Sequence, residues 1–218
     1  MIASTPAPSQ HSSASIVTAG VIPEFKRRTL LQWVAASAVL VGVGGNRAAG
    51  FFLGRSRNEL IVTALPDEWV RRNGSQLKAY AQFIDSLRLE KITTMQLVEA
   101  HAKQHGAVWN TLPPAQLWKN IGRTLLVVDR LAKELREPVK EIISAYRSPA
   151  YNARCYGARS GSWHQANYAI DVSFDMRARN VTRAARSMRQ TGVFRGGVGG
   201  YAGFTHIDTR GMNIDWGV

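Results

Sequence analysis

Apolar side chains recur at helical spacing in three stretches before residue 138. Residues 77–87 and 94–105 each place apolar positions on one helix face. The third stretch, 114–136, is longer, and its apolar residues lie mostly three or four apart (Leu117, Ile121, Leu125, Val128 and Leu135). Pro138 ends this pattern, because proline cannot continue a helix. We therefore predict three helices here, whereas residues 51–73 show no strong period.

The pattern becomes strand-like after residue 138. Residues 139–145 and 168–174 are predicted strands, and Ala169, Asp171 and Ser173 share one face of the second. Residues 179–190 have helical spacing and are strongly basic. Two more strands are expected at 198–201 and 204–208, joined by a tight turn. Helices followed by strands predict an α+β fold, with a small antiparallel sheet packed against helices and preceded by an N-terminal helical segment.

The first 49 residues differ in composition from the rest of the chain. Residues 1–23 are rich in Ser, Thr, Ala and Pro and have no apolar period, which predicts disorder. The basic run Lys26-Arg27-Arg28 then leads into the apolar stretch 33–45, which is short for a membrane span and suits a signal peptide. Two arginines followed closely by two leucines resemble the twin-arginine export signal. Residues 1–49 are therefore predicted to be a leader and export signal.

This leader predicts an exported protein, periplasmic or extracellular. Cleavage after Ala49 would leave no stable membrane span, whereas a retained leader would anchor the protein in the membrane. Arg47 fits poorly in a small-residue cleavage site, so both outcomes stay open. The remainder divides into a helical part, 50–138, and a core, 139–218, which we expect to form one domain with it.

Charge and cysteine content narrow the functional classes. The chain has 218 residues and a formal net charge of +13, which indicates an anionic partner. The basic residues are spread along the chain, without zinc-finger spacing or an RNA-binding aromatic signature, so no nucleic-acid partner is predicted. Cys155 is the single cysteine, which excludes an internal disulfide framework and a multi-thiolate metal site.

Two histidines and one carboxylate are candidate metal ligands: His164, Asp171 and His206. Asp171 falls on one predicted strand and His206 on another, and neighbouring strands can bring such groups together. Three protein ligands leave the fourth tetrahedral position to water, as in catalytic Zn²⁺ sites. We therefore expect a Zn²⁺ cofactor, and the alternative is that the two histidines are unrelated surface or core residues.

The residues around these three extend the pattern. In chain order they are Ser144-Ala145-Tyr146-Arg147-Ser148, Asn152, Ser162-x-His164, Ala169-x-Asp171 and His206. The set resembles the zinc D-Ala-D-Ala peptidases of peptidase family M15, which include D,D-carboxypeptidases, D,D-dipeptidases and cell-wall endopeptidases. The resemblance spans about residues 142–216.

The resemblance also implies roles for the matching residues. His164, Asp171 and His206 would carry the metal, and Arg147 would contact the substrate and stabilise the oxyanion. A fixed guanidinium suits that role because it neutralises charge developing on a carbonyl oxygen.

The proton acceptor is the least defined part of this expected site. Members of the dipeptidase type carry Glu or Asp three residues before the last histidine, where this chain has Gly203. Asp208 shares a strand face with His206 and is our candidate general base. It is equally suited to orienting a histidine. Asp175 and Asp215 are weaker candidates.

These features predict an exported zinc metallopeptidase that hydrolyses D-Ala-D-Ala or related D-amino-acid bonds in peptidoglycan stem peptides. Carboxypeptidase and endopeptidase action both stay open, and so does the oligomeric state. The alternative is a non-catalytic, zinc-containing cell-wall-binding module, an interpretation that Gly203 keeps open.

Two other motifs have simpler interpretations. His101 and His105 are four apart, but the glutamate of a His-Glu-x-x-His protease is missing, so a solvated helix face is expected. Gly197-x-Gly199-x-x-Ala202 matches a dinucleotide fingerprint in form but opens no helix, so turn glycines between short strands are expected.

Overall fold

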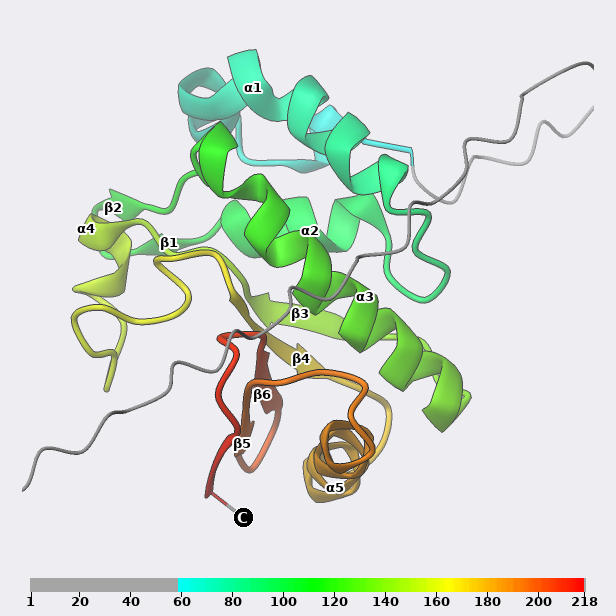
Figure 1. The fold of residues 1–218 in the computed structure, drawn as a ribbon. Coiled ribbons are helices and arrows are strands. Elements are labelled where there is room, and N and C mark those ends of the chain that lie inside the picture. The colour runs from blue at the N-terminus through cyan, green and yellow to red at the C-terminus, as the bar shows by residue number, and fades with distance from the viewer. Residues whose placement is uncertain (1–58, 218) are drawn as a thin grey trace, which may run out of the picture. The chain divides into compact units, whose positions relative to one another are not determined.

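In the computed structural model, which describes residues 59–217, three helices precede the main sheet, and two more helices lie between its strands (Figure 1). These residues belong to one unit, and the leader predicted at 1–49 lies outside them. The N-terminal elements are a 3₁₀ turn (Val62–Ala64), α1 (Asp67–Ser86), α2 (Thr94–His101), β1 (Gln104–His105), β2 (Val108–Trp109), a second 3₁₀ turn (Ala115–Leu117) and α3 (Trp118–Leu135). The remaining elements are β3 (Glu141–Ser144), α4 (Pro149–Asn152), β4 (Ala169–Ser173), α5 (Ala178–Gln190), β5 (Gly197–Gly200), β6 (Thr205–Asp208) and β7 (Ile214–Gly217). The predicted α+β class is confirmed.

The main sheet has five strands in the order β3-β4-β6-β5-β7. Neighbouring strands are antiparallel as predicted, except that β7 pairs with β5 in parallel. The sequence did not predict β7. It is a short edge strand whose residues are mostly exposed, so burial imposes no clear alternation on them.

Helices α3 and α5 pack against the sheet and against each other, and α2 packs against β3 (Figure 1). Helix α1 lies on the outer side of this layer, against α2 and α3. One continuous core joins the helical and strand-rich parts. Its fully buried members include Trp69, Leu97, Ile121, Leu125, Leu131, Ile142, Ile170 and Ile207. Within residues 59–217, no helix is both long enough and apolar enough to cross a bilayer.

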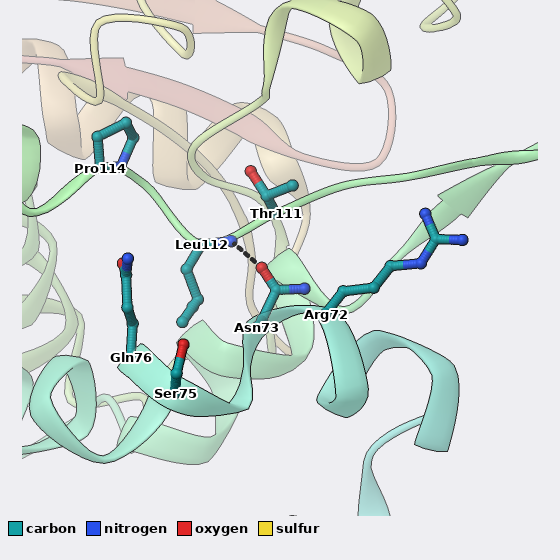
Figure 2. A pocket seen from close by; sticks show the side chains of 7 residues that line it. All are labelled: Arg72, Asn73, Ser75, Gln76, Thr111, Leu112 and Pro114. Atoms are coloured by element: carbon teal, nitrogen blue, oxygen red, sulfur yellow. Dashed lines mark hydrogen bonds between the residues drawn. The ribbon is translucent and has the colours of Figure 1, made fainter.

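Helix α1 begins at Asp67, ten residues before the predicted start. Its buried face includes Trp69, Asn73 and Leu77, so a polar residue interrupts the apolar period. The Asn73 side chain donates to the Trp69 carbonyl and accepts from the Leu112 backbone N–H at 3.1 Å (Figure 2). A buried asparagine with both groups satisfied is tolerated, and this is why the pattern alone missed the first half of α1.

Helix α2 ends at His101, four residues before the predicted end. Ala102 already leaves helical geometry, and Gly106 adopts a φ of +58° in the turn between β1 and β2. His105 therefore lies exposed on β1. The predicted solvated helix face is wrong for His101, which is buried, with Nε2 2.9 Å from the Tyr80 hydroxyl.

Stability is expected to fall in acid because of His101. Burial lowers the pKa of His101 to about 3, from 6.5. The unfolded state then binds more protons between these values, so the free energy of unfolding decreases by about 1.4 kcal/mol per pH unit as the pH falls through that window. His101→Phe keeps a buried ring and should flatten this dependence. Urea unfolding at several pH values, with a metal chelator present throughout, measures the pH dependence of the free energy of unfolding for wild type and for His101→Phe.

His105 supplies the matched control for this experiment. His105→Gln changes an exposed side chain on β1 and should leave the slope of wild type. Equal slopes for wild type and His101→Phe would contradict the role given to His101.

Candidate metal centre

One row of paired residues crosses the whole sheet and carries much of the site. Ser144 pairs with Asp171, Asp171 with His206, His206 with Gly199, and Gly199 with Trp216. Directly paired residues of neighbouring strands point to the same face of a sheet. The row therefore places a carboxylate, an imidazole and an indole side by side, with a glycine between the two rings.

The adjacent row points to the opposite face and fixes this arrangement. Ile170 pairs with Ile207, and Ile207 with Val198, and all three are fully buried in the core. A one-residue slip would move these apolar side chains out of the core. Burial of the aliphatic row therefore holds the polar row in register.

The structure brings His164, Asp171 and His206 together. Their candidate ligand atoms all lie within 4.8 Å of one another, and the residues are only 3 %, 3 % and 7 % exposed. Asp171 uses both oxygens: Oδ2 lies 3.4 Å from His164 Nε2, and Oδ1 lies 2.8 Å from His206 Nδ1. Two imidazoles and a carboxylate form a donor set typical of catalytic zinc.

His164 lies in the loop before β4 and is positioned by backbone groups. Its Nδ1 is 2.7 Å from the Ala145 carbonyl, an acceptor, so we assign the proton to Nδ1. The lone pair is then on Nε2, which faces Asp171. The His164 carbonyl accepts from the Arg147 and Asn167 backbone N–H groups, which ties the loop to the end of β3. This geometry leaves Nε2 available to a metal ion.

His206 lies between two carboxylates. Nε2 is 3.1 Å from Asp208 Oδ2, an acceptor, and we assign the proton of the neutral ring to Nε2, which leaves the lone pair on Nδ1. Nδ1 then faces Asp171 Oδ1 at 2.8 Å, and two acceptors at this distance require a positive charge close by. Either a second proton on His206 or a metal ion bound by both atoms meets that requirement. The residues therefore fit a metal ion.

Electrostatics favour the ligand forms of these groups. Burial raises the pKa of Asp171, but the charges and hydrogen bonds of His164 and His206 outweigh it and hold this pKa well below its usual range. Burial also lowers the pKa of His164. For His206, burial lowers the pKa, and its bonds to Asp171 and Asp208 outweigh this effect and raise it. An ionised carboxylate and a neutral His164 are the forms that bind metal.

Arg147 lies beside this cluster. Its Nη2 donates to Asp171 Oδ2 at 2.8 Å, and its Nε donates to Ser144 Oγ at 2.7 Å. The side chain is 17 % exposed, so Arg147 is partly accessible next to the candidate metal ligands. The arginine predicted from the sequence therefore lies where it can meet a group bound at the cluster.

Asp208 lies behind His206 and is saturated with hydrogen bonds. Oδ1 accepts from the Gly197 N–H and from the Arg210 backbone and Nε, and Oδ2 accepts from His206 and Arg210 Nη2. A carboxylate has about four lone-pair sites, so none is left for a substrate or water. Burial raises the pKa of Asp208, but the bonds from His206, Arg210 and Gly197 outweigh it and leave this pKa well below its usual range.

The two weaker acidic candidates lie apart from the cluster. Asp175 is paired with Lys140 Nζ at 2.5 Å on the surface. Asp215 pairs in the sheet with Val198, whose row faces the core, and binds Arg186 and Arg189 of α5. The hollow between α1 and residues 111–114, about 270 Å³, is also separate: its lining contains none of the predicted site residues (Figure 2).

The glycines of β5 make room for the row. They lie within the strand, not in a turn as predicted. A Cβ on Gly199 would lie 2.3 Å from the Trp216 indole, and a Cβ on Gly197 would lie 2.4 Å from Asp208 Oδ2. Trp216 can therefore lie across β5 only because Gly199 has no side chain.

Gly199→Ala is expected to lower the free energy of unfolding by about 1–3 kcal/mol, the usual cost of overpacking. The added methyl group must displace the Trp216 ring, since the two would overlap. Chemical denaturation followed by tryptophan fluorescence measures the change. Gly203→Ala is the matched control, because a Cβ there meets nothing within 4 Å. Equal stability of the two variants would contradict this packing argument.

Sequence reasoning missed three groups of this site: the Ala145 carbonyl, Arg210 and Trp216. A backbone acceptor leaves no trace in residue identities. Arg210 stands only two residues after Asp208, but its partner is fixed by the turn that follows β6. Trp216 belongs to the unpredicted strand β7.

Comparison with known proteins gives one result. A family model described as Peptidase M15 matches residues 90–208, more than half of the chain. The match includes the three clustered residues and Arg147. No curated protein and no solved structure matches the chain.

Proposed function

The chain belongs to the peptidase M15 family, and from this premise we propose an exported zinc metallopeptidase that hydrolyses D-Ala-D-Ala or related D-amino-acid bonds in peptidoglycan stem peptides. Family membership supports peptidase activity. The observation that carries the proposal is the buried cluster of His164, Asp171 and His206, whose ligand atoms lie within 4.8 Å. We propose a peptidoglycan peptide, and not a nucleic acid, as the partner.

In this proposal His164 Nε2, Asp171 and His206 Nδ1 hold the metal. When bound, zinc lowers the pKa of a water molecule to about 7 and polarises the scissile carbonyl. Arg147 neutralises charge that develops on the carbonyl oxygen in the transition state. Its bonds to Asp171 and Ser144 fix the guanidinium before the substrate arrives, so no reorganisation is needed.

We assign Asp208 to the orientation of His206, the alternative that the sequence left open. The carboxylate has no exposed surface, and its lone pairs are occupied by Gly197, Arg210 and His206. A general base must reach the proton that it removes, either directly or through one water molecule. Accepting the Nε2 proton keeps the opposite nitrogen of His206 free for the metal.

Hydrolysis of defined muropeptides tests the proposed function. Purified protein with zinc is expected to release D-Ala from pentapeptide fragments or to cut cross-linked dimers, and mass spectrometry of the products separates these outcomes. A chelator should stop the reaction and added Zn²⁺ should restore it, because the three ligands act through the metal.

A second function, a non-catalytic cell-wall-binding module, is favoured by one observation: Gly203 replaces the acidic residue of the dipeptidase type. A protein that binds stoichiometric zinc but releases no product from pentapeptide fragments or cross-linked dimers would contradict the peptidase proposal. Binding of the same protein to insoluble peptidoglycan would then support the module.

A further inference from the structure

A second arginine, Arg210, pairs with Asp208, the carboxylate that faces the nitrogen of His206 opposite Asp171. Its Nε and Nη2 contact both oxygens of Asp208, with Nε 2.8 Å from Oδ1, and its backbone N–H donates to Oδ1 at 3.1 Å. The Asp208 side chain is 0 % exposed and that of Arg210 is 13 % exposed. A fork-shaped contact to both oxygens fixes the plane of the carboxylate as well as its position.

The guanidinium of Arg210 also contacts two indoles. Its central carbon lies 5.0 Å from the Trp163 ring centroid and 5.5 Å from the Trp216 ring centroid, within the range of cation–π contacts. Trp163 directly precedes His164 in the chain, and the Trp216 ring lies 5.0 Å from the His206 ring. Arg210 therefore touches residues that adjoin both histidines of the cluster.

Charge pairing around His206 is symmetrical. Asp171 on one side is paired with Arg147, and Asp208 on the other side is paired with Arg210. Without Arg210, Asp208 would lose its paired guanidinium and keep the hydrogen bonds from His206 and the Gly197 N–H. A buried carboxylate that loses its paired guanidinium is strongly destabilised, so it would move from this position. It would then stop accepting the Nε2 proton of His206 in the present geometry.

We infer that Arg210 is a positioning residue of the metal centre, which acts through Asp208 to fix the orientation and proton position of His206. The inference rests on the proposed function only in that the cluster binds a metal ion. Removing a partner that orients a ligating histidine typically weakens metal binding by roughly 10- to 100-fold. The contacts of Arg210 place it one step further out, behind such a partner.

Zinc affinity of the full chain tests this inference directly. Competition with a chromophoric chelator is expected to give a dissociation constant raised about 10-fold or more in Arg210→Ala. Arg210→Lys keeps the charge but loses the fork-shaped contact, so its zinc dissociation constant should lie between those of wild type and Arg210→Ala. Arg195→Ala removes an exposed arginine near β5 and should match wild type. In the Co²⁺-loaded proteins, the visible absorption of Arg210→Ala should shift, since the His206 ligand is reoriented.

A double-mutant cycle tests whether Arg210 acts through Asp208. Once Asp208→Asn has weakened zinc binding, adding Arg210→Ala should have little further effect, because both changes break the same connection. Full additivity would overturn the proposed route. Unchanged zinc affinity in Arg210→Ala would overturn the inference itself, and if that variant does not fold, unchanged affinity in the conservative Arg210→Lys does so.

The outcomes also separate this inference from the proposed function. Zinc bound by wild type without peptide hydrolysis would remove the peptidase proposal and leave the role of Arg210 standing. Hydrolysis by wild type, with equal zinc affinity in every Arg210 variant, would support the peptidase proposal and remove the role of Arg210.

Discussion

Replacing His206 with alanine is expected to remove zinc and to lower kcat by at least about 10³-fold, since a bound metal supplies several kcal/mol of transition-state stabilisation. The change removes one of the two proposed nitrogen ligands and leaves Asp171 and Asp208 without the ring that separates them. His164→Ala should have the same effect, because its Nε2 faces the same carboxylate. Metal analysis after dialysis and hydrolysis of a muropeptide substrate measure both consequences.

His105→Ala is the control for these variants. It removes an exposed histidine on β1 and should keep both zinc and activity. Thermal unfolding in a chelator, where wild type also lacks metal, shows whether the variants still fold. Stoichiometric zinc in a folded His206→Ala protein would exclude His206 as a ligand.

Arg147→Ala is expected to lower kcat about 10²- to 10³-fold at saturating Zn²⁺, the loss typical for removal of one oxyanion partner. The guanidinium lies beside Asp171 and is held by Ser144, so it is in place before a substrate binds. Arg147→Lys retains the charge but cannot reproduce both contacts, and should recover only part of the rate. Steady-state kinetics at several zinc concentrations separates this loss from weaker metal binding.

The exposed Arg154 offers a matched control in the same part of the chain, and Arg154→Ala should behave as wild type. A raised KM with unchanged kcat in Arg147→Ala would contradict the transition-state role, because that result indicates binding that is equally strong in the ground state.

The sequence predicted the convergence of the three candidate ligands better than it predicted the groups around them. Asp171 and His206 were found because strand alternation places both on one face, and the observed register pairs them directly. The orientation of His164 depends on the Ala145 carbonyl, which every residue type would offer. The fork between Arg210 and Asp208 depends on the chain direction after β6 and on the two indoles around it.

The same distinction explains the errors in the helices. The amphipathic period located α3 closely, since its buried positions are apolar at nearly every turn. In α1 the buried Asn73 is satisfied by Leu112, which lies far along the sequence, so local periodicity carried no sign of it. Tertiary hydrogen bonds of this kind let a polar residue occupy a buried helix position, which the local hydrophobic period does not predict.

The row that joins Ser144, Asp171, His206, Gly199 and Trp216 has a consequence for how this protein can change in evolution. Inserting or deleting one residue inside β4 or β6 would exchange the two faces of that strand, and the candidate metal cluster and the core packing would be lost together. Within the main sheet, insertions and deletions are therefore expected to be tolerated only in the connections between strands. Point substitutions at exposed positions of the outer helix α1 do not have this effect.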